Sequence, residues 1–334
     1  MKNLYLHIGT NKTGTSAIQK TLSTINDLLI ENNCIYPLSF RDSEFSTAHH
    51  DLAVLLKTKT FTHDSAKILR EEIINSSCEN TIISSESLHD INDAQLLFPL
   101  LSLFENTYII LYVRDSLSYA ISWYQQNAQA KGSILQFPDF VYLTKPDLIR
   151  VHKDFESIVS DDISLLVREY NRHAFPNGNI IDDFISLLPL DANFISKIPN
   201  IVSNASMQNP SICGNLLYLR GLQSATFRDT SMITNTYNFF TMVSSYRKSR
   251  FQGLSYVDIK SMPDLMRKFT HQNNYFNKKY QFNLNIVEPS TEKMSPNFTT
   301  LREDFDFINS HIDDSNEHLI KLKPLLSLDF SKYL

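Results

Sequence analysis

A segment near the N-terminus contains the residue types of a phosphate-binding loop. The apolar run at residues 4–8 is followed by a loop at residues 9–14, and a helical pattern of apolar residues begins at Ser16. In a strand, loop and helix arrangement of this kind, backbone N–H groups and the positive end of the helix dipole point at the loop and bind anions. Two of the seven glycines of the chain lie in this loop. We therefore expect a phosphate group to bind there.

The spacing within the loop argues against a nucleoside triphosphatase. Gly9 and Gly14 match the first half of the nucleoside triphosphatase pattern GxxxxGK[ST], but Thr15 stands where that pattern has its lysine. The lysine of this loop is Lys12, two residues before Gly14. The later run YIILYVRD also offers no convincing aspartate for Mg²⁺, because its acid follows an arginine instead of ending the apolar run. Mg-ATP chemistry is therefore disfavoured, and a nucleotide-dependent kinase with a deviant loop is kept as an alternative.

A second segment has residues suited to another phosphate group. Residues 108–113 form a continuous apolar run typical of a buried strand, and Arg114 follows it directly. Ser122 comes eight residues later in a helix-like stretch. Arginine is a permanent cation whose fork of donors matches phosphate oxygens, and a serine hydroxyl adds another donor. The other interpretation is a surface pair between Arg114 and Asp115, with Ser122 an ordinary helix residue.

Together the two segments resemble the sulfotransferases that use 3′-phosphoadenosine-5′-phosphosulfate, PAPS. The run Lys-Thr-Gly-Thr-Ser at residues 12–16 is similar to their 5′-phosphosulfate loop, K-[ST]-G-[ST]-[ST]. The extended form HIGxxKTGTSxIQ looks most like the branch that acts on carbohydrates in bacteria. The spacing of Arg114 and Ser122 is similar to that of the family's 3′-phosphate motif. The resemblance covers residues 1–190 well and the rest of the chain loosely.

This resemblance implies roles for individual residues. Lys12 would neutralise charge on the oxygen that bridges phosphate and sulfate. The 5′-phosphate would be held by backbone N–H groups and by hydroxyls of the loop. The implied donor-binding residues are Lys12, Thr13, Gly14, Thr15, Ser16, Arg114 and Ser122. The implied reaction is sulfuryl transfer from PAPS to a sugar or glycan hydroxyl by in-line displacement, with no metal required. A relative that binds a nucleotide or glycan without turnover is the non-enzymatic alternative.

Sulfuryl transfer to a hydroxyl also needs a base, and two places in the chain offer one. Glu86 follows the apolar strand at 80–85, where it either activates the acceptor or merely starts a helix. His49 and His50 form a tandem pair before another helix, where they either act on the acceptor or serve as a cap and a surface residue. His7, read as a buried structural histidine, and His89 are weaker candidates.

Two further basic positions lie where the family has nucleotide contacts. Arg168 ends an expected strand. In the family, the corresponding strand leads into a turn near the adenine. An ion pair with Glu169 or Asp183 is an equally good interpretation of that arginine. The basic cluster at residues 247–250 is the nearest counterpart of a late 3′-phosphate segment, or a solvated helix end.

The order of patterns along the chain indicates an α/β fold. Strands expected at 4–8, 34–37, 80–85, 107–113 and up to residue 168 alternate with helices expected at 15–32, 51–58, 64–76, 92–103, 116–131 and 179–188. This alternation predicts a central parallel sheet flanked by helices, with ligands beyond the carboxyl ends of its strands. After a loop-rich stretch at 190–209, helical patterns follow at 210–222, 234–245, 258–281 and 298–310. We therefore expect a PAPS-binding core at 1–190 and a mostly helical, acceptor-binding part at 191–334 of the same domain.

The composition narrows the classes of function. The 334 residues carry a formal net charge of −5, which argues against non-specific nucleic-acid binding. Three widely spaced cysteines favour a reducing compartment. No secretory signal is visible, and the apolar stretches are far below the ~18 residues that suggest a spanning helix. We expect a cytoplasmic protein without an integral membrane segment. The acceptor and the oligomeric state are not indicated by the sequence.

Overall fold

The computed structural model describes residues 1–41, 47–131, 137–191, 194, 212–227, 229–246, 248–251, 262–286 and 295–329. By its internal contacts the chain divides into two units. The first spans Met1–Arg114, Asp147–Gln208 and Asn274–Leu284, and the second spans Asp115–Pro146, Asn209–Asn273 and Asn285–Leu334. Neither unit coincides with residues 1–190 or with residues 191–334, because residues 115–146 belong to the second unit.

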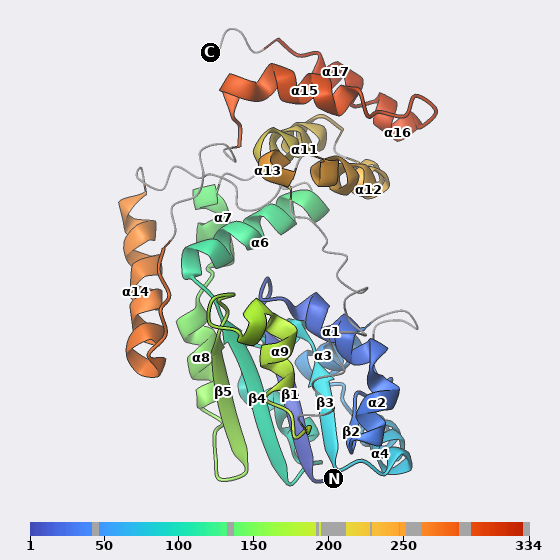
Figure 1. The fold of residues 1–334 in the computed structure, drawn as a ribbon, viewed down its shortest axis with the longest axis vertical. Helices are drawn as coiled ribbons and strands as arrows, with labels where there is room; N and C mark the ends of the chain where they lie inside the picture. The colour runs from blue at the N-terminus through green and yellow to red at the C-terminus, as the bar shows by residue number, and fades with distance from the viewer. Residues whose placement is uncertain are drawn as a thin grey trace. The chain divides into compact units, whose positions relative to one another are not determined.

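The first unit is built on one parallel sheet. Its strands lie side by side in the order β2-β3-β1-β4-β5 (Figure 1), and every pair of neighbours is parallel. The strands are β1 (Asn3–Gly9), β2 (Cys34–Ile35), β3 (Asn80–Ser84), β4 (Asn106–Val113) and β5 (Ile163–Glu169). The chain proceeds from β1 to one side of the sheet and later returns to its other side. The carboxyl ends of β1, β3 and β4 therefore flank the point where strand order reverses, which is the usual ligand position in such sheets.

The continuous apolar runs of the sequence are explained by burial on both faces of this sheet. Side chains alternate between the faces, so Tyr5 and Leu6 point in opposite directions, yet both are buried. One face packs in a core cluster with α1 (Thr15–Thr24) and α9 (Ile180–Ile185). This cluster includes Tyr5, Ile82, Ile110 and Tyr112 from the strands and Ile18, Leu22, Ile181 and Phe184 from the helices. The expected α/β class with a central parallel sheet and flanking helices is confirmed.

The helices of the first unit differ from the sequence-based expectation in three places, one of which is α8 (Leu148–Glu156), a helix that the sequence patterns did not predict. The helix expected at 15–32 is divided into α1 and α2 at Ile25, whose ψ of 15° interrupts the helical path. The helix expected at 92–103 is a 3-10 turn, η2, continued by the short α5, with Pro99 near the junction. The helices are α1 (Thr15–Thr24), α2 (Asn26–Glu31), α3 (His50–Lys57), α4 (His63–Ser76), α5 (Phe98–Leu101), α8 (Leu148–Glu156) and α9 (Ile180–Ile185), with 3-10 turns η1 (Glu86–Leu88), η2 (Ala94–Leu97) and η3 (Pro176–Gly178).

The described part of the second unit is mostly helical, as expected for the C-terminal part of the chain. Its elements are α6 (Ser116–Lys131), α7 (Phe137–Thr144), α11 (Gly214–Phe227), α12 (Thr230–Tyr246), α13 (Lys248–Phe251), α14 (Pro263–Tyr280, in the first unit from Asn274 on), η6 (Phe298–Thr300), α15 (Leu301–Asn309), α16 (Glu317–Ile320) and α17 (Lys323–Leu326). Most of the loop-rich stretch expected at 190–209 lies outside the described residues. In the part of the chain that the structure describes, none of the helices is long and apolar enough to cross a membrane.

A buried arginine connects three helices of the second unit. The Arg220 side chain is fully buried, and burial lowers its pKa to about 10. Its guanidinium donates to the Gln129 carbonyl of α6, to Gln223 on its own helix, and to the Ile233 carbonyl and Thr236 hydroxyl of α12, at 2.7–3.0 Å. All five of its N–H donors therefore have acceptors, which is what a buried guanidinium requires.

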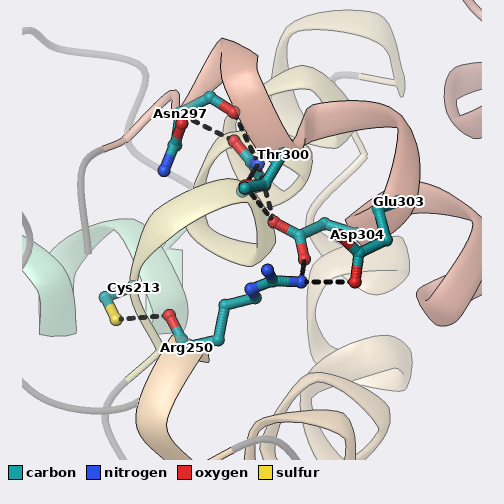
Figure 2. A network of polar contacts seen from close by, with 7 residues as sticks. Cys213, Arg250, Asn297, Thr300, Glu303 and Asp304 are labelled. Carbon is teal, nitrogen blue, oxygen red and sulfur yellow. Dashed lines mark hydrogen bonds and ion pairs between the residues drawn. The ribbon is translucent and has the colours of Figure 1, made fainter. Parts of the chain in front are cut away.

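A second polar network joins α11, α13 and α15 (Figure 2). Asp304 is buried and accepts from Asn215 at 2.8 Å and from Thr300 at 2.9 Å. Its other oxygen accepts from Arg250 at 2.7 Å, and Arg250 also pairs with Glu303 at 3.1 Å. Arg250 is the described arginine of the basic cluster at residues 247–250, and here it neutralises a buried carboxylate.

Candidate functional site

The loop between β1 and α1 turns through three residues with positive φ. Gly9 has φ +91°, Lys12 has φ +65° and Gly14 has φ +77°. Glycine adopts such angles without the steric penalty of a Cβ, which explains the loop's two glycines. Gly14 is the N-cap of α1, and its carbonyl accepts from Ala17 at 3.0 Å and from Ile18 at 3.1 Å. The positive end of α1 therefore faces the loop, as the phosphate-loop prediction requires.

Hydrogen bonds to the neighbouring strand hold this loop in shape. The backbone N–H and the hydroxyl of Thr10 both donate to the Tyr112 carbonyl of β4, at 3.3 and 3.2 Å. The Thr13 hydroxyl donates to the Thr10 carbonyl at 2.5 Å. Thr10 and Thr13 are fully buried. Thr13 therefore uses its hydroxyl inside the loop, and its predicted contribution to donor binding rests on its backbone.

Two cations meet at the loop. Arg114, which follows β4, donates from Nη1 to the Lys12 carbonyl at 2.9 Å. The Arg114 guanidinium lies 5.4 Å from the centroid of the Tyr170 ring. Burial and the charge of Arg114 lower the pKa of Lys12, and the nearby Glu86 carboxylate acts in the opposite direction. An anion bound between the two cations would relieve their mutual repulsion.

Glu86 begins η1 two residues after the end of β3, and it lies against the loop. In the register of β1 and β3, His7 pairs with Ser84, so Gly9 and Glu86 come two residues later on neighbouring strand ends. A Cβ placed on Gly9 would lie 3.0 Å from the Glu86 Cβ. The Glu86 carboxylate accepts from the Gln19 amide at 2.6 Å. The loop, β3 and α1 therefore converge on this one carboxylate.

The tandem histidines have different surroundings. His50 starts α3, and its side chain is 30% exposed. Its Nδ1 lies 2.9 Å from the Ser85 hydroxyl and 3.1 Å from the Ser87 hydroxyl, while its Nε2 lies 3.9 Å from Glu86 Oε1. The structure thus brings two of the predicted base candidates, Glu86 and His50, together.

His49, in contrast, is fully buried. Its Nε2 donates to the Pro37 carbonyl at 2.9 Å, and its Nδ1 accepts from the backbone N–H of Ser84 at 3.3 Å. Burial lowers its pKa to about 3. Both ring nitrogens are occupied by backbone groups, so His49 joins β3 to the segment after β2.

The remaining histidines near the loop are also buried. His7 lies under the loop with its Nδ1 2.8 Å from the Ser84 hydroxyl, and burial lowers its pKa to about 3. His89 donates from Nδ1 to the Glu86 carbonyl, and burial lowers its pKa. His7 was expected to be structural, and its burial agrees with that interpretation.

Arg168 forms one of the two ion pairs that the sequence left open. Its guanidinium pairs with Asp183 on α9. Asp183 is fully buried and also accepts from the Tyr112 hydroxyl at 2.7 Å. This network joins β4, β5 and α9. A Cβ placed on Gly14 would lie 3.3 Å from the side chain of Ile180, the first residue of α9, so the start of α9 lies next to the loop.

Other predicted residues lie on α1 and α6. Thr15 is buried and Ser16 exposed in the first turn of α1. Ser122 is buried on α6, in the second unit, so its partnership with Arg114 stays a prediction. Within the described residues, no group of three or more His, Cys, Asp and Glu is arranged to hold a metal ion.

Sequence reasoning assigned no role to Gln19 or Tyr170. Gln19 lies four residues after Thr15, so both face the same side of α1, and both are buried. A glutamine on the apolar face of a helix was a usable signal. Tyr170 packs between the Arg114 guanidinium and Gly14, and only the tertiary structure reveals this contact.

Comparison with protein-family models finds no match, and comparison with curated proteins finds none either. Among solved structures, the chain is similar to the crystal structure of retinol dehydratase in complex with androsterone and the inactive cofactor PAP. The two share 13% sequence identity with a TM-score of 0.28, over 86% of this chain and 84% of that chain. A TM-score this low carries no information about function, which must be inferred from the residues of the site.

Proposed function

We propose that this protein is a PAPS-dependent sulfotransferase that transfers a sulfuryl group to a hydroxyl of a carbohydrate or surface glycan. The observation that carries the proposal is the loop before α1. It combines a helix N-terminus, two glycines with positive φ and two adjacent cations, Lys12 and Arg114. The sequence of the loop, with its extended form HIGxxKTGTSxIQ, favours the donor PAPS and a carbohydrate acceptor.

The residues present suit an adenosine 3′-phosphate 5′-phosphosulfate. Backbone N–H groups of residues 13–16, with the Thr15 and Ser16 hydroxyls, would hold the 5′-phosphate. Arg114 would bind the 3′-phosphate together with Ser122. Lys12 would lie at the bridging oxygen, where negative charge grows as the S–O bond breaks.

The acceptor is activated by a base in this proposal. The acceptor oxygen attacks sulfur as the bond from sulfur to the bridging oxygen breaks, and its proton passes to the base. We assign this role to Glu86, which lies beside the loop and within 3.9 Å of His50. His50 is the second candidate. His49 is assigned a structural role, because backbone groups occupy both of its ring nitrogens.

The binding experiment separates this function from the kinase alternative. Adenosine 3′,5′-bisphosphate, the desulfated product, should bind and raise the melting temperature by mass action, whereas ATP with Mg²⁺ should do much less. Arg114→Ala should weaken bisphosphate binding by about 1.5–3 kcal/mol, and less for an analogue without the 3′-phosphate. If ATP-Mg stabilised the protein and the bisphosphate did not, the result would contradict the sulfotransferase proposal and favour a kinase.

The turnover experiment separates an enzyme from a binding protein. Lys12→Ala should lower turnover of PAPS by ~100-fold or more while the bisphosphate still binds, because the lysine acts mainly on the transition state. Glu86→Gln should lower turnover with little change in donor affinity. If Glu86→Gln stays active while His50→Ala is inactive, His50 is the base. A wild-type protein that binds the bisphosphate but turns over PAPS with none of a panel of sugars and glycans would indicate a non-catalytic relative.

A further inference from the structure

Gln19 stands out among the buried polar residues of the first unit, because its amide reaches a carboxylate at the edge of the candidate site. It is 3% exposed and lies in the second turn of α1, between Ile18 and Leu22 of the core. Its Nε2 donates to Glu86 Oε2 at 2.6 Å. An ionised carboxylate can accept hydrogen bonds but cannot donate them, so the amide presents its nitrogen to Glu86. Burying an amide costs free energy unless its hydrogen bonds are made, so the folded state favours the contact between Gln19 and Glu86.

The two oxygens of Glu86 therefore have different neighbours. Oε2 accepts the Gln19 amide, whereas Oε1 lies on the side of His50, 3.9 Å from its Nε2. At the other end of the side chain, the Glu86 Cβ and Cα lie within 3.0 and 3.2 Å of the position that a Cβ on Gly9 would take. The side chain is thus confined at its base by the loop and at its tip by α1. With Cβ and Oε2 both fixed, the direction of Oε1 is fixed as well.

We propose that Gln19 is a positioning residue that orients Glu86 so that Oε1 receives the proton of the acceptor hydroxyl. This inference rests on the proposed function, because it concerns the base of that reaction. The same helix carries the phosphate loop at its N-terminus and Gln19 one turn later. One helix therefore fixes the position of the bound donor relative to the base. An in-line reaction is accelerated when the reacting groups are held in the correct relative position.

The contact itself is tested by NMR, without any need for turnover. In ¹⁵N-labelled protein, the side-chain amide signal of Gln19 is assigned by its loss in Gln19→Leu. Glu86→Ala should move this signal markedly, because the amide loses its charged acceptor, whereas His50→Ala should move it little. A Gln19 amide signal that is unchanged in Glu86→Ala would overturn the proposal.

The positioning role is tested by a double-mutant cycle in turnover. Gln19→Leu keeps the size of the side chain and loses the donor. It should lower turnover of PAPS, measured as bisphosphate formation with a panel of neutral sugars, by ~10-fold or more with bisphosphate affinity unchanged. In the Glu86→Gln background the same change should have little further effect. Thr21→Val, a buried substitution in the same helix, is the matched control and should leave turnover near the wild-type level.

Each outcome of this cycle has one meaning. Normal turnover in Gln19→Leu, or an equal loss in the wild-type and Glu86→Gln backgrounds, would overturn the positioning role and leave the sulfotransferase proposal intact. An equal loss in Thr21→Val would show that the effect comes from destabilising α1, and would also overturn it. Wild-type protein that binds no bisphosphate and turns over no PAPS would instead remove the proposed function, and the positioning role with it.

Discussion

Replacing Gly9 with alanine should damage the candidate site through one added methyl group. Gly9 has φ +91°, where an L-residue is strained by about 1–2 kcal/mol. The new Cβ would lie 3.0 Å from the Glu86 Cβ and 3.2 Å from its Cα, closer than packed carbon atoms normally come. Because one of these atoms is backbone, η1 must shift, and overpacking of this kind typically costs about 1–3 kcal/mol. We therefore expect Gly9→Ala to lower the free energy of unfolding by about 2–5 kcal/mol.

Alanine substitutions at two other glycines distinguish the effect of backbone strain from the effect of a close contact. Gly178 has φ +67°, but its added Cβ would meet only the Arg172 carbonyl, at an ordinary 3.6 Å, so Gly178→Ala should cost about 1–2 kcal/mol. Gly221 lies within α11, and its added Cβ would have nothing within 4 Å. Gly221→Ala should stabilise by about 0.5–1 kcal/mol, because alanine favours a helix interior.

The assay is denaturant unfolding of the three variants, followed by bisphosphate binding and PAPS turnover. We expect the order of stability Gly221→Ala, wild type, Gly178→Ala, Gly9→Ala, with a loss of turnover in the last variant only. If Gly9→Ala and Gly178→Ala were equally stable and equally active, the close packing of the loop on Glu86 would be refuted.

Three further changes test the rest of the fold. Arg220→Met should destabilise by at least about 3 kcal/mol, measured by denaturant unfolding, because it leaves several buried acceptors without their donor. Asp183→Ala should cost about 1–3 kcal/mol, because it leaves the buried Tyr112 hydroxyl without its acceptor, and it should cost less in a Tyr112→Phe background. Unfolding stability should fall as the pH is lowered from about 6.5. Burial lowers the pKa of His7 and of His49 to about 3 in the folded protein, so the unfolded state binds more protons below pH 6.5, and each histidine contributes up to about 1.4 kcal/mol per pH unit until its folded pKa is reached.

Matched controls accompany these three predictions. Arg302→Met removes an exposed pair with Asp306 and should cost no more than about 0.5 kcal/mol; an equal loss in Arg220→Met would contradict the role of the buried guanidinium. For Asp183, equal losses with and without the Tyr112 hydroxyl would show that the hydroxyl is not its partner. A stability that stays flat between pH 6.5 and 5 would mean that His7 and His49 bind protons equally in the folded and unfolded states, so their pKa values are not lowered by folding.

Features that depend on local residue order could be predicted from the sequence. A phosphate loop needs an apolar strand, glycines that accept positive φ and the start of a helix, and these follow one another within residues 4–18. The strands were recognisable because side chains on both faces of a parallel sheet are apolar, which makes continuous runs such as residues 108–113. Strand ends carry the candidate residues Gly9, Glu86 and Arg114, so their common edge followed from parallel topology alone.

Contacts between residues that are far apart in sequence depend on how the elements pack. Gln19 and Glu86 are separated by 67 positions and meet because β1 and β3 are neighbours in the sheet. The two tandem histidines follow one another in the chain, yet His49 is buried against backbone groups and His50 is partly exposed beside Glu86. Local sequence cannot distinguish such neighbours, because burial depends on which distant segments pack over each side chain.

The same limit applies to charge pairs. Arg168 had two acidic candidates, Glu169 next to it and Asp183 on a later helix, and the structure pairs it with Asp183. Consecutive residues of a strand point to opposite faces, so Glu169 was the poorer partner on geometry, but the position of α9 over the sheet was needed to supply the better one. Arg220 likewise finds its acceptors on three helices. Sequence order specifies the elements and their ends, and the packing of those elements selects which polar groups meet.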